Sequence, residues 1–423
     1  MKVLTHLETP AQSSHRFPQF LPDGRHFLYY VTGSPEVRGV YVGSLDGSQT
    51  HRLIPGADSP AVFSTGHLLF VRQETLFAQN FNPVQLTVSG NLIPVAEHLS
   101  VIASNVAPLS ASDTGTIVFR AGSSNVLRQL KWFDRSGKEV GNIGDPDAAS
   151  PLFPSVSPNG KLLALQRTKA GNADIWVLDT VRGVPNRFTF DPATDSYPTW
   201  SYDSSRIIFS SNRKGAYALY QMSANRPSSQ ELVLATSANM QTQDWSSANG
   251  FVLYRTPDSK MGYDLFAFQA DGDKKELKVV ATDYDEREGQ FSPDGKWIAY
   301  QSNKSNRYEI YVQAFPGPGS VLPISTNGGT QVRWGRDGKE LFYIALDNRL
   351  MSVPIRVASD GQTIEPGAPI PLFLTSVGGA LQSSSGAGHQ YAVSDNGQRF
   401  LMNTFVETSA EPITVILNWK PKP

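Results

Sequence analysis

The chain of 423 residues contains no cysteine, so it forms no disulfide, holds no thiolate-bound metal and has no cysteine nucleophile. Charge of either sign is sparse and balanced: charged residues make up 18% and the formal net charge is −1. This composition gives no electrostatic argument for binding nucleic acid or an anionic membrane. No window approaches the roughly 18 apolar residues of a membrane-spanning helix. We therefore expect no nucleic-acid partner and no membrane contact by this chain itself.

Helical patterns are also missing. No segment shows apolar residues at the i, i+3, i+4, i+7 spacing between recognisable caps. Glycine (35 residues) and proline (29) are plentiful, which indicates many turns. The apolar runs between these turns are short and rich in β-branched and aromatic residues, as in half-buried strands. The sequence predicts an all-β protein.

One hairpin pattern repeats along the whole chain. In residues 291–300, FSPDGKWIAY, two short strands flank a turn in which Pro293 pre-sets φ, Asp294 bonds the backbone ahead of it and Gly295 supplies a positive φ. Versions of this hairpin occupy residues 20–29, 63–70, 112–119, 156–165, 200–209, 245–254, 291–300, 334–343 and 393–402. A period of about 40–50 residues built from short strands is typical of propeller blades.

Further strands follow each hairpin, so each unit predicts a four-stranded blade. The expected units lie near residues 17–54, 59–99, 106–144, 153–190, 196–233, 241–280, 287–325, 330–373 and 389–419. The last unit supplies only three strands, the third at residues 413–417, and residues 2–5 read as a strand without a blade. We therefore predict a single closed β-propeller of about nine (eight to nine) blades, over residues 1–423, whose last blade is closed by the N-terminal strand.

The repeat resembles that of TolB-like (WD-repeat-like) propellers, on the SPDGKWIAY hairpin and the EIYV strand after it. The longer segments EIYVQAFPGPG, STNGGTQVRW, RDGKELFY and PITVILNW resemble the C-terminal propeller of bacterial receptor-like serine/threonine kinases and related regulators. The likeness covers residues 17–419 and implies a sensing or interaction role for the propeller. The kinase motifs themselves, a glycine-rich loop with Val-Ala-x-Lys and a His-Arg-Asp loop, do not occur in the chain.

Motifs that carry chemistry are scarce. The seven histidines form no His-Glu-x-x-His or similar pair, and no Gly-x-Ser-x-Gly elbow occurs. Four carboxylates at positions 283, 285, 286 and 288 could hold Ca²⁺, although a solvated acidic loop is the simpler interpretation. We predict no catalytic residue, no bound metal and no cofactor. A propeller lyase or hydrolase that uses channel carboxylates or histidines remains the alternative.

Polar residues that differ between units are the better candidates for ligand binding. They stand where each unit enters its first strand, which we expect at the mouth of a central channel. The candidate ligand-binding residues are His15, Arg16, Tyr197, Gln243, Asp244, Glu288, Gln290, Gln331 and Arg333. The repeated aromatic residues of the hairpins (Phe20, Trp200, Trp245, Phe291 and Trp334) are instead expected to pack between adjacent blades.

The sequence therefore predicts a non-catalytic binding or sensor module for a protein, a peptide or a small molecule, within a larger bacterial signalling protein. A passive scaffold in an envelope complex is a further alternative. We expect the chain to be soluble as given, and to lie in the periplasm or outside the cytoplasm if it is the sensor part of a receptor-like kinase.

Overall fold

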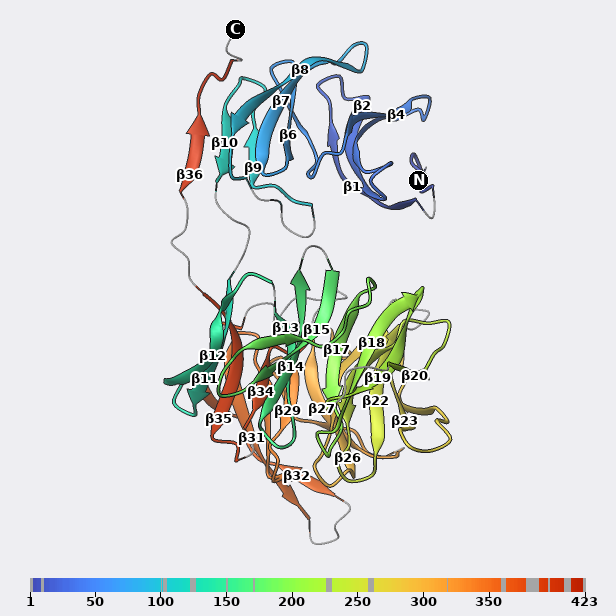
Figure 1. Ribbon diagram of the computed structural model, residues 1–423, viewed down its shortest axis with the longest axis vertical. Helices are drawn as coiled ribbons and strands as arrows, with labels where there is room; N and C mark the ends of the chain where they lie inside the picture. Colours follow the sequence, from blue (N-terminus) through green and yellow to red (C-terminus); the bar gives the residue numbers. More distant parts are fainter. Residues whose placement is uncertain are drawn as a thin grey trace. The chain divides into compact units, whose positions relative to one another are not determined.

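The computed structural model describes residues 3–8, 11–99, 101, 105–121, 127–149, 151–169, 172–225, 230–257, 262–317, 319–358, 363–377, 388–394, 396–406 and 412–420. These ranges hold 36 strands in nine antiparallel sheets and no helix, so the all-β prediction is confirmed (Figure 1). It follows that no helix in the described part of the chain could span a membrane. The chain divides into two compact units: unit 1 is residues 1–126 with 407–423, and unit 2 is residues 127–406.

Unit 2 contains six sheets. One combines two early and two late strands, β12 (Glu139–Asp147), β11 (Arg128–Asp134), β35 (Arg399–Phe405) and β34 (Tyr391–Val393), in that order. The next three are β13 (Leu152–Val156), β14 (Leu162–Lys169), β15 (Asn172–Asp179) and β16 (Pro185–Arg187); β17 (Asp195–Trp200), β18 (Arg206–Lys214), β19 (Ala216–Ser223) and β20 (Glu231–Leu234); and β21 (Gln241–Trp245), β22 (Phe251–Pro257), β23 (Tyr263–Gln269) and β24 (Leu277–Val280). The last two are β25 (Glu286–Phe291), β26 (Trp297–Ser302), β27 (Glu309–Ala314) and β28 (Leu322–Pro323); and β29 (Thr330–Trp334), β30 (Glu340–Ile344), β31 (Arg349–Val357) and β32 (Ile364–Pro366), with β33 (Ile370–Leu374) also paired to β31.

The first strands of these six sheets contact one another in cyclic order. β13 contacts β17, and the series continues through β21, β25 and β29 to β34, which in turn contacts β13. The core of unit 2 lies between neighbouring sheets, as the packing of Trp245 from β21 against Ile208 and Leu219 of the preceding sheet illustrates. Trp200, Phe291 and Trp334 lie in the corresponding buried clusters. The predicted packing of these aromatic residues between blades is confirmed in unit 2.

Unit 1 contains three sheets. They are β1 (Gln12–Phe20), β2 (His26–Gly33), β3 (Gly39–Ser44) and β4 (Thr50–Pro55); β5 (Val62–Ser64), β6 (His67–Arg72), β7 (Thr75–Asn82) and β8 (Thr87–Ala96); and β36 (Ile413–Ile416), β10 (Ile117–Arg120) and β9 (Leu109–Ala111). Buried apolar residues join the first sheet to the second, and the second to the third. Phe20, however, is 60% exposed, so its predicted packing between blades is wrong.

Two of the predicted repeat units exchange strands. The unit at residues 106–144 places β9 and β10 in unit 1 but β11 and β12 in unit 2, while the unit at 389–419 does the reverse. Thus β11 pairs with β35 from Arg128–Phe405 to Asp134–Arg399, and β10 pairs with β36 from Ile117–Ile416 to Arg120–Ile413. The two repeats have the same phase, so the third strand of either one fits beside the second strand of the other.

This exchange corrects the predicted closure of the fold. Residues 3–5 form no strand, and Lys2 lies outside the described residues. The sheet of β34 and β35 is completed by residues 128–147, not by residues 2–5, and the strand at 413–416 lies in unit 1. The nine sheets therefore do not follow one another round a single ring closed by the N-terminus.

Candidate functional site

Five of the six first strands of unit 2, all but β34, share an irregularity in pairing. The register against the second strand shifts around Phe153, Tyr197, Gln243, Glu288 and Gln331. Four of these five residues, all but Gln243, have φ between 52° and 56°. Such bulges re-aim side chains within a strand, and positive φ in a residue other than glycine persists only where the surroundings impose it. Four of the candidate ligand-binding residues therefore stand at these bulges.

Glu288 is the centre of a buried cluster of charges. Its carboxylate lies 3.3 Å from Nη1 of Arg255, 3.8 Å from Nη2 of Arg333 and 3.6 Å from Nδ1 of His389. The His389 backbone N–H also donates to Glu288 Oε2 at 3.0 Å. Burial alone would raise the pKa of Glu288, but the bond to His389 and the charge of Arg255 lower it to about 2. Glu288 is thus ionised and satisfied by partners within the unit.

The other members of this cluster are fixed as firmly. Arg255 is fully buried, donates from Nε to Gln241 Oε1 at 2.7 Å, and lies over the rings of Tyr263 and Tyr197 at 4.8 and 5.6 Å. Burial, together with the charge of Arg333, lowers the pKa of His389 to about 4, so its imidazole is neutral at pH 7. These residues form a rigid polar centre.

Several predicted residues connect one sheet to the next. Asp244 Oδ2 accepts a hydrogen bond from the Phe291 backbone at 2.8 Å, and Gln290 Oε1 accepts one from the Trp334 backbone at 2.6 Å. Gln331 Oε1 likewise accepts from the Gln390 backbone at 2.7 Å. Each bond satisfies a buried donor of the following sheet. Burial raises the pKa of Asp244 to about 6.

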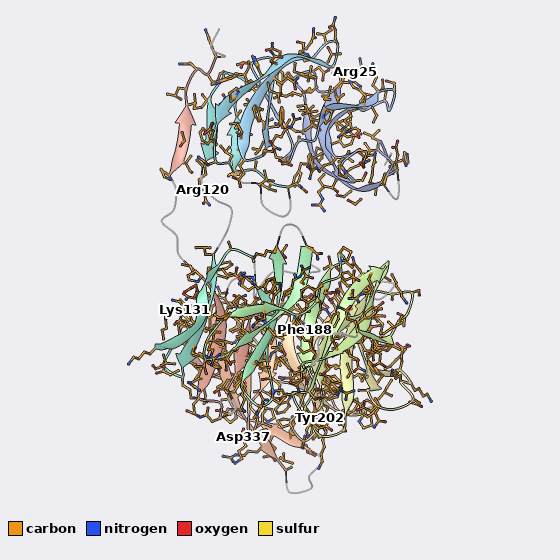
Figure 2. The ribbon with its side chains drawn as sticks, in the orientation of Figure 1. Arg25, Arg120, Lys131, Phe188, Tyr202 and Asp337 are labelled. Atoms are coloured by element: carbon orange, nitrogen blue, oxygen red, sulfur yellow. The ribbon has the colours of Figure 1, made fainter. Side chains whose placement is uncertain are left out.

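A cavity of about 590 Å³ opens where the first strands of unit 2 end. Its walls come from all six first strands or the turns beside them. Figure 2 shows two of these turn regions through Tyr202 and Asp337, which follow β17 and β29 at the same end of unit 2. Trp200, Trp245, Phe291 and Trp334 form the aromatic part of the wall. This size is within the usual range of small-ligand and peptide pockets.

The nine predicted residues divide into three groups. Gln243, Asp244, Gln290 and Arg333 line the cavity. Tyr197, Glu288 and Gln331 are buried at the bulges and are not among the residues that line it. His15 and Arg16 belong to β1 of unit 1, where they bond Gln12 and Ser14. The cavity lies at the end where the first strands finish, whereas the sequence placed the mouth at the loops where they begin.

Gln243, in the cavity wall, uses only one end of its side-chain amide in hydrogen bonds with the described residues. Its amide nitrogen donates to the Thr242 backbone carbonyl at 2.9 Å, but its Oε1 is buried without a hydrogen-bond partner among the described residues. The indole nitrogens of Trp245 and Trp334 also lack a described partner. Three polar atoms of the cavity wall are therefore closed off from solvent and without a partner among the described residues, which is unusual for buried polar atoms.

The carboxylates at 285–288 point to separate partners rather than to one ion. Asp285 accepts from the Tyr308 hydroxyl and from Arg287, while Glu286 accepts from Thr282 and Ser302. Among the described residues, no group of three or more His, Asp or Glu side chains is arranged to hold a metal. The predicted absence of a metal stays a prediction.

Sequence reasoning missed His389, Arg255 and Tyr202. His389 lines the cavity and contacts Glu288, but the Gly- and Ser-rich sequence before it interrupts the repeat pattern. Arg255 is the fifth residue of β22; the charge that it places in the run FVLYRTP was the available signal. Tyr202, half exposed beside the cavity, stands in a turn that we treated only as architecture.

Comparison with known proteins agrees with this fold. A family model described as the TolB beta propeller domain matches residues 117–287. The chain is similar in structure to a protein assigned as TolB from Agrobacterium tumefaciens, with 17% identity and a TM-score of 0.52, over 67% of this chain and 99% of that one. TolB from Acinetobacter baumannii aligns at 14% identity and a TM-score of 0.45, over 70% and 79%. No curated protein matches the chain.

These similarities define the class of the fold. Residues 117–287 carry a TolB-like propeller repeat, as the sequence predicted, and the similarity to the Agrobacterium protein supports the same fold more widely. At 17% identity that similarity concerns the fold alone. The predicted likeness to kinase-associated propellers stays a prediction.

Proposed function

We propose that unit 2 is a closed six-bladed propeller that acts as a non-catalytic binding module. Closure is supported by the cyclic contacts of its first strands and by bonds between its last and first sheets, where Asn403 Nδ2 donates to the Pro151 carbonyl at 2.6 Å. A chain that completes its last sheet with an early strand hides its edges. The blade count of this ring is then six, not nine.

The ligand of this module is a peptide segment of a partner protein that enters the 590 Å³ cavity. The observation that carries this proposal is the composition of the cavity wall, in which Gln243 stands beside an aromatic surface. Gln243, which is partly exposed, would turn its amide to pair with the backbone of a bound peptide, while the aromatic wall of Trp200 and Trp334 would cover the peptide's apolar side chains. A small molecule with a donor group is the other occupant that the geometry allows.

Peptide selection on the full chain tests this function. A random heptapeptide phage library is panned against the protein, and the consensus peptide is synthesised and titrated by calorimetry. Gln243→Leu should weaken binding about tenfold, since the hydrogen bond is lost while the side-chain volume is nearly kept. Tyr202→Ala, at the cavity rim, should weaken it about as much.

A matched tyrosine provides the control. Tyr202 and Tyr284 are 50% and 47% exposed, but only Tyr202 lines the cavity. Tyr284→Ala should therefore leave the affinity unchanged. If the selected peptide binds Gln243→Leu and Tyr202→Ala as tightly as it binds the unmodified chain, the cavity is not the binding site.

We propose further that this binding serves as the sensing step of a bacterial signalling protein. The support is the sequence likeness to kinase-associated propellers, together with a cavity suited to reversible binding. Reading the coding sequence upstream of Met1 tests the proposal. A kinase or DNA-binding domain joined through a spanning helix would support it, and a gene that encodes only the propeller would contradict it.

A further inference from the structure

The sheet of β36, β10 and β9 in unit 1 has an incomplete edge. It contains three strands, while the other eight sheets of the described residues contain at least four. β36 pairs with β10 on one side only, and Figure 1 shows it as the outermost strand of its sheet. In the complete sheets, short strands such as β24 (Leu277–Val280) fill the corresponding fourth position. The backbone of β36 is thus placed to pair with one more strand.

The side chains of this edge are apolar and exposed. Ile413 and Val415 of β36 are 68% and 51% exposed and share one face of the strand; Leu417, 68% exposed, follows the last residue of β36. Ile416, on the opposite face, and Trp419, beyond the end of the strand, pack against the buried cluster around Ile117. The Trp419 backbone also donates to the Gly115 carbonyl at 2.9 Å. The strand is therefore held in place while one of its faces stays uncovered.

Natural edge strands usually carry a charge, a bulge or an inward proline that prevents pairing with another chain. Residues 412–419, PITVILNW, contain no charged side chain. Pro412 precedes the strand and therefore removes no donor from it. An exposed edge without these features is open to pairing with another strand.

We propose that β36 pairs antiparallel with β36 of a second copy of this chain. The sequence is symmetric about Val415, so a two-fold axis there, with β36 lengthened by one residue on pairing, places Val415 opposite its own copy and Ile413 opposite Leu417. All three apolar pairs then lie on one face, where cross-strand contacts stabilise the sheet. Because the strand is uncharged, the two copies meet without like charges opposite one another.

The absence of cysteine makes this pairing testable to the level of single residues. Directly opposite Cα atoms of an antiparallel pair lie about 4.5–5.5 Å apart, within the span of a disulfide. Under mild oxidation, Val415→Cys should give a disulfide-linked dimer. Ile413→Cys and Leu417→Cys should each give no disulfide-linked dimer alone, but should form a mixed disulfide-linked dimer when combined.

Sedimentation equilibrium of the cysteine-free protein measures the same contact. We expect a weak dimer whose fraction rises with concentration, and Val415→Lys should raise its Kd at least about tenfold by placing two ammonium groups opposite each other. Val84→Lys is the control, because Val84 is 89% exposed in the β7–β8 turn of the same unit.

Each outcome decides the proposal. A monomer at every concentration overturns it, as does a dimer that Val415→Lys leaves intact. Open-ended aggregates also contradict it, because the two-fold pairing uses the single edge of both copies. Cross-linking of Val84→Cys as fast as Val415→Cys would show random collision. Unchanged circular dichroism of the variants confirms that each is folded.

Discussion

Two copies of one hairpin, residues 20–29 and 291–300, show how position in the fold changes the role of a motif. Both read as an aromatic residue, a Pro-Asp-Gly turn and a second apolar strand. Phe291 is 4% exposed, packed edge-on against Phe315 and within a cluster that includes Leu253 and Leu265 of the preceding sheet. Phe20 is 60% exposed and contacts Phe27 of its own sheet.

The difference between the units lies in the neighbouring sheet. In unit 2 each first strand is flanked by another in cyclic order, so the repeated aromatic residue is covered from the side. In unit 1, β1 belongs to the first of three sheets, and its last five residues are all exposed. The motif forms a hairpin in both units, but its aromatic residue is buried only where a neighbouring sheet packs against it.

The largest predicted effect separates these two phenylalanines. Phe291→Ala should lower the free energy of unfolding of unit 2 by about 3–5 kcal/mol, through lost burial and a cavity between two sheets. Phe20→Ala should change that of unit 1 by less than about 0.5 kcal/mol, because its ring is already largely in water. Urea titration followed by tryptophan fluorescence reports mainly on unit 2, which holds six of the seven tryptophans.

Hydrogen exchange measured peptide by peptide gives the corresponding change in the free energy of unfolding of unit 1. Equal losses at the two positions would contradict the contrast between a covered and an uncovered hairpin. A large effect of Phe20→Ala would show that a partner covers this surface in solution.

The sequence predicted the local elements well because each carries its own signal. Turn residues such as Pro293 and Gly295 and the apolar alternation after them placed every hairpin within a few residues of its strands. The strand exchange could not be predicted, since β11 suits β35 and β36 suits β10 as well as each would suit its own repeat. Period and phase are the same in both arrangements, and only tertiary contacts decide between them.

The candidate site was predicted in part for a similar reason. The polar residues that differ between repeats at one position of the unit indicated Gln243, Gln290 and Arg333, which line the cavity. This variation between repeats could not distinguish the cavity-lining residues from Glu288 and Gln331. The bulges that turn these two side chains into the interior have no signature in the sequence. The partner of Glu288, Arg255, comes from a second strand, whereas the variable polar positions stand in the first strands.

Acid should also distinguish the two units. The bulge of β25 in unit 2 carries the ionised Glu288, whereas the comparable irregularity in β1 of unit 1 carries Phe17. The pKa of Glu288 is about 2 in the folded chain against an ordinary 4.5, so the unfolded chain binds more protons between these values. Stability from this group is therefore present above pH 4.5 and lost as the pH falls towards 2.

Glu288→Gln tests this dependence. At pH 7 the change should cost unit 2 about 3 kcal/mol, the equivalent of the pKa shift, because Arg255 and Arg333 lose their buried counter-charge. The variant should then lose less stability than the unmodified chain between pH 4.5 and 2. Glu97→Gln, at an exposed position of unit 1, is the control. If the free energy of unfolding falls equally for all three proteins between pH 4.5 and 2, Glu288 is not held as described.

The smallest effect concerns the turn glycines of the same two hairpins. Gly24 and Gly295 have φ of 64° and 69°, so alanine at either position costs about 1 kcal/mol in backbone strain. A Cβ on Gly24 would meet nothing within 4 Å, but one on Gly295 would lie 2.9 Å from Ala248 Cβ and 2.8 Å from Asn249 Nδ2, in a turn of the preceding sheet. Gly295→Ala should therefore be the more destabilising substitution, by about 1 kcal/mol. Since the backbone term is shared, the difference between the two variants measures the contact between neighbouring sheets alone. An equal loss would mean that the turns of unit 2 move apart freely, which the Asn249 hydrogen bond to the Gly295 carbonyl at 3.1 Å argues against.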